Sequence, residues 1–263
     1  MPRTPAATLL ATAALLLAAA ASQAAPTIRL SVRTEPIPEF AHTGNIAGAG
    51  ASILTQVGID GSEYGGHPPP LVGISLRLPP GMRWNESGFP ACLVYALEPG
   101  SPGPFGCPQG SEVHPESKAA LDVAFGTEVV NEEATISTRY ALDGGLTLKL
   151  FGHEPVLIEI LTRGIARQDG SGKGELLLFE VPLVETVPGG VDASFTSIGY
   201  RLGSGFQPDP KTQRFSLHVP RHCPRGFLRF SVEARFAALG GLPPQTATAS
   251  DRTPCPHKAQ RSR

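Results

Sequence analysis

Two glutamates in a predicted β-hairpin have the residue type and spacing needed for glycoside hydrolysis. The segments 155–166 (PVLIEILTRGIA) and 174–185 (GELLLFEVPLVE) flank a turn-forming stretch. If Asp169 and Gly170 are the two central turn residues, Glu159 and Glu180 lie directly opposite each other on antiparallel strands. Opposed side chains have Cβ atoms about 5 Å apart, and carboxyl groups at about that distance suit a retaining glycosidase. The sequence therefore offers a carbohydrate-active hydrolase with Glu159 and Glu180 as its catalytic pair.

Three observations weigh against this pair. A turn centred on Ser171 would pair Glu159 with Leu183 and remove the site. A cation on a neighbouring strand, Arg139 or Lys149, would ion-pair with one of the glutamates. One Trp and four Tyr leave few flat rings to stack on a sugar. The hydrolase is therefore the alternative function, and a non-enzymatic role is the leading one.

The sequence predicts neither a metal site nor a cofactor. His218 and His222 have the i, i+4 spacing of a helical metal pair, but the surrounding residues alternate like a strand. On a strand the two side chains would stand about 13 Å apart. The run DGSGK at 169–173 resembles a phosphate-binding loop, but no Ser or Thr and no helix follow it. We interpret it as a hairpin turn.

Four cysteines predict two disulfides in an exported chain. Cys92 and Cys107 enclose 14 residues, and Cys223 and Cys255 enclose 31. Short loops cost less entropy to close, so we favour these two pairs over the other two possible pairings.

The first 24 residues have the features of a secretory signal peptide. Arg3 forms a short basic region, residues 9–21 are apolar, and Ser22-Gln23-Ala24 is a small-x-small cleavage site. Thirteen apolar residues rise only about 20 Å as a helix, too short for a hydrocarbon core of about 30 Å. We expect cleavage after Ala24, secretion, and a mature chain without a transmembrane segment.

The charge of the chain argues against a nucleic-acid partner. The formal net charge is −1, and nucleic-acid binding needs a clustered basic surface. The basic end, HKAQRSR at 257–263, is more typical of a solvated terminus than of a binding patch.

Short alternating segments between turns predict an all-β fold. The 30 Gly and 27 Pro supply the turns. Two segments, 155–166 and 174–185, are more uniformly apolar, as strands buried on both faces would be. We count ten to twelve strands and predict an antiparallel β-sandwich, of double-layer, jelly-roll or Ig-like type. Clear alternation marks 27–33, 120–125, 134–142, 146–151 and 228–236.

Turn-rich stretches divide the predicted mature chain into three parts. We predict an N-terminal β region with a disulfide loop at 25–107, a main antiparallel β-sandwich at 108–245, and a C-terminal tail at 246–263 held by a disulfide. One domain and two packed subdomains meeting near 108–118 both remain open at this point.

A further set of segments carries a resemblance. They are GFPAC (88–92), GCPQGS (106–111), VAFGTE (123–128), PVLIEIL (155–161), VPLVETVPGGVDAS (181–194) and the Cys-Pro pairs at 223 and 255. Together they resemble a group of uncharacterised exported all-β proteins from soil actinobacteria. The resemblance covers most of the predicted mature chain and implies a bacterial origin and a signal peptide. It transfers no catalytic residue.

These observations favour an extracellular or envelope-associated binding or structural module that presents a surface from a rigid β scaffold. We expect the partner to be a cell-envelope component or a polysaccharide.

Overall fold

The computed structural model describes residues 25–37, 50–93, 97, 107–125, 128–168, 174–183, 193–209, 212–220, 226–238, 241 and 243–255. The predicted signal peptide lies outside these residues. Fifteen β-strands are present in the described part of the chain. They are β1 (Thr27–Pro36), β2 (Ala51–Asp60), β3 (Leu71–Arg77), β4 (Arg83–Trp84), β5 (Glu112–Phe125), β6 (Glu128–Tyr140), β7 (Leu146–Gly152), β8 (Ile158–Gln168), β9 (Glu175–Glu180), β10 (Ser194–Leu202), β11 (Gly205–Asp209), β12 (Thr212–Phe215), β13 (Leu217–His218), β14 (Phe227–Phe236) and β15 (Gln245–Pro254).

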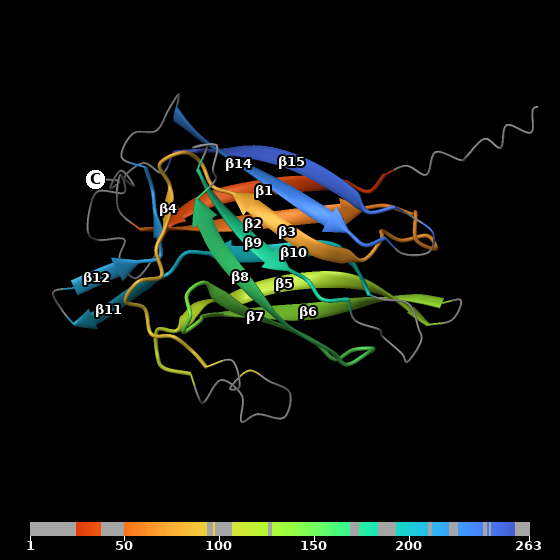
Figure 1. The fold of residues 1–263 in the computed structure, drawn as a ribbon, viewed down its shortest axis with the longest axis horizontal. Helices are drawn as coiled ribbons and strands as arrows, with labels where there is room; N and C mark the ends of the chain where they lie inside the picture. The colour runs from red at the N-terminus through yellow and green to blue at the C-terminus, as the bar shows by residue number, and fades with distance from the viewer. Residues whose placement is uncertain are drawn as a thin grey trace, which may run out of the picture.

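Eleven of these strands form a single antiparallel sheet that is nearly barrel-shaped. The strand order is β1-β2-β10-β5-β6-β7-β8-β9-β3-β14-β15. The two edge strands lie next to each other, and the backbone N–H of Val32 on β1 donates to Oδ2 of Asp251 on β15 at 2.8 Å. Figure 1 shows β14, β15 and β1 on one side of the molecule and β5, β6 and β7 on the opposite side. The antiparallel all-β prediction is confirmed, but the sheet curls toward closure rather than clearly forming the two layers of a sandwich.

The core fills the inside of the curled sheet, because apolar residues alternate along the strands. On β14 the residues predicted to share one face, from Leu228 to Phe236 in steps of two, are at most 2% exposed. On β6 the predicted inner face of Ala134, Ile136, Thr138 and Tyr140 is also buried. These two alternation predictions are confirmed.

The prediction that 155–166 and 174–185 are buried on both faces is wrong. On β9, Leu177 and Phe179 are buried, whereas Leu176 and Leu178 are only partly buried on the outer face. Ile165 on the outer face of β8 is 46% exposed. A nearly closed sheet has one interior, so each strand can bury only one row of side chains.

Aromatic residues from the segment after β3 cover the core beside β6. The short strand β4 pairs with β13, with Trp84 opposite Leu217. The rings of Trp84 and Phe89 lie 6.2 and 4.5 Å from the Tyr140 ring. The buried carboxylate of Glu175 accepts two hydrogen bonds, from the backbone N–H of Trp84 at 2.5 Å and from the Nε2–H of Gln168 at 2.7 Å. This carboxylate therefore ties the covering segment to the β8–β9 hairpin.

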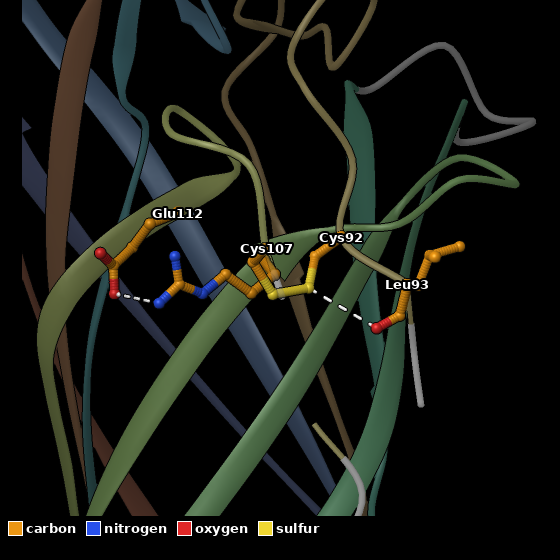
Figure 2. The surroundings of a disulfide bond; sticks show 5 residues. Cys92, Leu93, Cys107 and Glu112 are labelled. Atoms are coloured by element: carbon orange, nitrogen blue, oxygen red, sulfur yellow. Dashed lines mark hydrogen bonds and ion pairs between the residues drawn. A yellow bond between two sulfur atoms is a disulfide. The ribbon is translucent and has the colours of Figure 1, made fainter. Parts of the chain in front are cut away.

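The predicted disulfide between Cys92 and Cys107 is confirmed, with Cα atoms 4.8 Å apart (Figure 2). The backbone N–H of Cys92 donates to the carbonyl of Tyr140 at 2.8 Å, which fixes the disulfide at the end of β6. Cys223 lies outside the described residues, so its pairing with Cys255 stays a prediction. Cys255 itself is buried and is not a free thiol.

Strands from both sides of the predicted boundary near residue 108 share the main sheet. β2 lies between β1 and β10, and β3 lies between β9 and β14. The first half of the segment predicted as a C-terminal tail, residues 246–254, lies in β15, which pairs with β14 along its length. Within the described residues, no helix has the length and apolar character to cross a membrane.

Candidate functional site

The predicted opposition of Glu159 and Glu180 is wrong. β8 and β9 do form an antiparallel hairpin, but Gln168 lies opposite Glu175 and Gly164 opposite Phe179. This register differs by four residues from the one that would bring the glutamates together. The cause is the connection, because β8 ends at Gln168 and β9 begins at Glu175 instead of meeting at a two-residue turn.

The two glutamates instead have separate surroundings. Glu159 lies opposite Phe151 of β7 and forms an ion pair with Lys149, one of the two cations considered from the sequence. Glu180 lies opposite Gly73 of β3. The geometry on which the hydrolase hypothesis rests is therefore not formed by this pair.

The histidine pair is not formed in the described part of the chain. His218 lies in β13 opposite Arg83, and His222 is outside the described residues. Among the residues that can be described, no group of three or more His, Cys, Asp or Glu side chains is placed to hold a metal ion.

A concave surface on the outside of the sheet brings together charged residues that are far apart in the sequence. It is lined by residues of β8, β9, β3 and β14 and by Thr248 of β15, and its hollow has a volume of about 750 Å³. We call this surface the arginine face. Its charged residues are Arg77, Arg163, Arg167, Glu180, Glu233 and Arg235.

The registers of the four strands fix how the arginine face is arranged. Arg167 on β8 and Arg77 on β3 both lie directly opposite Leu176 of β9, one from each side. Their backbones are thus two strand spacings, about 10 Å, apart. In the next outward-facing row, Ile165 and Ser75 flank Leu178 in the same way. Aliphatic side chains therefore form the floor between the two cations.

A third row of the arginine face depends on a glycine. Gly73 on β3 pairs with Glu180 of β9 on one side and with Arg235 of β14 on the other. A Cβ built on Gly73 would overlap the guanidinium group of Arg235. The arginine side chain therefore lies across β3 because residue 73 has no side chain.

The cations differ in their partners. Arg163 forms an ion pair with Asp143 at 2.5 Å and donates to the carbonyl of Gly144 at 3.4 Å. That pair anchors it to the turn between β6 and β7. Arg77, Arg167 and Arg235 are the cations that surround the floor.

This arrangement combines charge-assisted hydrogen-bond donors with apolar contacts. Arginine offers paired N–H donors that match the oxygens of carboxylates and phosphates. The leucines and Ile165 offer apolar contact between these donors. The arginine face can therefore hold a ligand that carries repeated negative charges on a less polar backbone.

Sequence reasoning missed the arginine face. Alternation places Arg235 on the outer side of the predicted strand 228–236, but it does not show that this strand lies next to the one that ends at Arg77. No family model matches the chain, and comparisons with curated proteins and with solved structures found no match.

Proposed function

We propose that this protein is an exported, non-enzymatic binding module whose arginine face binds an anionic polysaccharide outside the cell or in the cell envelope. The observation that carries the proposal is the concave outer surface in which Arg77, Arg167 and Arg235 surround an aliphatic floor.

The position of the hollow supports a polymeric ligand. The arginine face lies on the outside of the sheet and extends over four strands, so a chain can pass across it. Two arginines about 10 Å apart can each contact a different charged group of the same chain.

The charge of the arginine face supports an anionic rather than a neutral sugar. With Arg163 paired to Asp143, three arginines face two glutamates in this surface, whereas the whole chain has a formal charge of −1. The cations are thus concentrated on one surface, which favours ligands of opposite charge. A neutral polysaccharide offers no charged group to the arginines.

The proposed location rests on the predicted signal peptide, the resemblance to exported actinobacterial proteins and the disulfide. The bond between Cys92 and Cys107 is compatible with an oxidising extracellular compartment. Export would bring the arginine face into contact with the anionic polymers of a cell envelope.

A binding experiment with matched polymers tests the proposal. The oxidised mature protein is titrated by calorimetry with polygalacturonate, with its fully methyl-esterified form, and with poly(glycerol phosphate). We expect binding to polygalacturonate and none to the neutral ester. Binding to poly(glycerol phosphate) alone would contradict the assignment of a polysaccharide as the ligand. Comparison of the two anionic polymers then shows whether carboxylates or phosphates are preferred.

A matched pair of variants locates the site. Arg77→Gln combined with Arg235→Gln removes two charge-assisted contacts, each worth about 1.5 to 3 kcal/mol, so we expect binding to weaken at least tenfold. Arg229→Gln is the control because Arg229 lies on β14 outside the hollow and donates to Ser250 at 3.4 Å. Equal binding of the neutral ester, or unchanged binding by the double variant, would overturn the proposal.

A further inference from the structure

The interior of the nearly closed sheet contains a cavity of about 90 Å³. Its walls come from opposite sides of the sheet, with Val57 and Ile198 on one side and Ile160 and Phe179 on another. It lies inside the sheet, whereas the arginine face lies on the outer surface of the strands, and Val232 of β14 lines both.

The polar side chains that line this cavity are already hydrogen-bonded. Thr55 donates its Oγ1 proton to the carbonyl of Tyr200 at 2.8 Å, and the Tyr200 hydroxyl donates to Oγ1 of Thr138 at 2.8 Å. Thr162 donates to the carbonyl of Glu180. A water molecule needs two to four polar partners to be stable in a cavity, and this lining does not provide them. The cavity therefore favours an apolar occupant.

The wall of the sheet is incomplete beside this cavity. β8 pairs with β9 only from Gly164 to Gln168, so among the described residues the first half of β8 has no ladder partner on that side. Figure 1 shows the two strands diverging beyond their paired part. Thr162 and Val181 line the cavity at this place and are both partly exposed. Leu183, two residues farther along, is 45% exposed and extends the apolar surface outward.

We infer that this cavity binds the apolar end of a saturated hydrocarbon chain that reaches it between β8 and β9. One water-sized group occupies about 30 Å³, so the cavity holds about the last three or four carbons of such a chain. The rest of the chain lies along Val181 and Leu183, and its polar end stays in solvent. The inference is independent of the proposed function of the arginine face.

Uncharged probes separate this site from the arginine face. The oxidised protein is titrated with the primary alcohols from butanol to decanol and followed by NMR of side-chain methyl groups. We expect binding to strengthen with chain length, with nuclear Overhauser contacts between the terminal methyl group of the alcohol and the methyl groups of Ile160 and Ile198. Binding of no alcohol, or binding without these contacts, would overturn the inference.

Two variants that change the volume of the cavity, with one control variant, test the same site. Val57→Phe fills the cavity and is expected to weaken octanol binding at least fivefold. Ile160→Ala enlarges it and is expected to move the preference toward longer alcohols. Leu121→Ala is the control because Leu121 is fully buried but does not line the cavity. If Val57→Phe does not fold, an unchanged chain-length preference of Ile160→Ala would still refute the inference.

Discussion

Glu132 is a fully buried carboxylate that fixes the connection between β7 and β8. It lies on the inner face of β6 and is 0% exposed. Its Oε1 accepts the backbone N–H of Glu154, and its Oε2 accepts that of Val156, both at 3.1 Å. A Cβ on Gly152 would overlap its carboxylate, so the glycine makes room for it. Glu132→Gln should therefore destabilise the protein although the shape of the side chain hardly changes.

The size of this effect follows from the two hydrogen bonds. An amide has one oxygen, so glutamine can accept only one of the two N–H groups, and its own NH₂ group then faces the other donor. A hydrogen bond to a charged group contributes about 1.5 to 3 kcal/mol. We expect Glu132→Gln to lower the free energy of unfolding by about that amount. In a domain of 150–250 residues this corresponds to a decrease in Tm of roughly 3 to 12 °C.

Urea denaturation of the oxidised protein, followed by tryptophan fluorescence, measures this difference. Glu133→Gln is the matched control because Glu133 is the next residue on β6 and is exposed. The control should change stability by less than about 0.5 kcal/mol. If Glu132→Gln were as stable as Glu133→Gln, the two hydrogen bonds would not stabilise the connection, and the reasoning would be refuted.

Three further measurements test the account of the core and the disulfide. Burial raises the pKa of Tyr140 from 10.0 to about 12, because the phenolate would lose its hydration. The stability that comes from the neutral Tyr140 is therefore fully present below pH 10, and up to about 3 kcal/mol of it is lost as the pH rises to 12. Urea denaturation at each pH should show a smaller loss for Tyr140→Phe. Phe230→Ala, at a fully buried position, should lower the free energy of unfolding by about 3 to 5 kcal/mol, whereas Phe227→Ala, at a position 48% exposed, should cost much less. Cys92→Ser combined with Cys107→Ser should lower it by about 3 kcal/mol, because the closed loop spans 15 positions, and an unchanged urea midpoint would contradict this.

Local patterns predict the strands well because alternation depends only on neighbouring residues. The inner faces of β14 and β6 follow directly from the sequences FLRFSVEARF and ATISTRY, since one face of each strand is apolar. The hairpin of β8 and β9 is also predicted. Its register is not, because Gly170, Gly172 and Gly174 allow several turns in the connecting residues, and the position of Glu180 relative to Glu159 depends on which turn forms.

The arginine face could not be predicted because it depends on contacts between distant strands. Arg77, Arg167 and Arg235 are each exposed or partly exposed strand residues when considered alone. They form one surface only because β3 lies between β9 and β14. Alternation assigns each arginine to an outer face, but it carries no information on the order of the strands. The same holds for the near closure of the sheet, which brings β1 and β15 together.

The most direct test of the proposed function is an NMR titration of the arginine side chains with oligogalacturonate. We expect the Nε–H signals of Arg77, Arg167 and Arg235 to shift as the oligosaccharide is added, while those of Arg29 and Arg229 stay in place. Arg29 is a suitable reference because it lies on β1 and is already paired with Asp60 at 3.0 Å. Shifts confined to Arg29 and Arg229, or no shift at any arginine at saturating oligosaccharide, would contradict the assignment of the arginine face as the binding site.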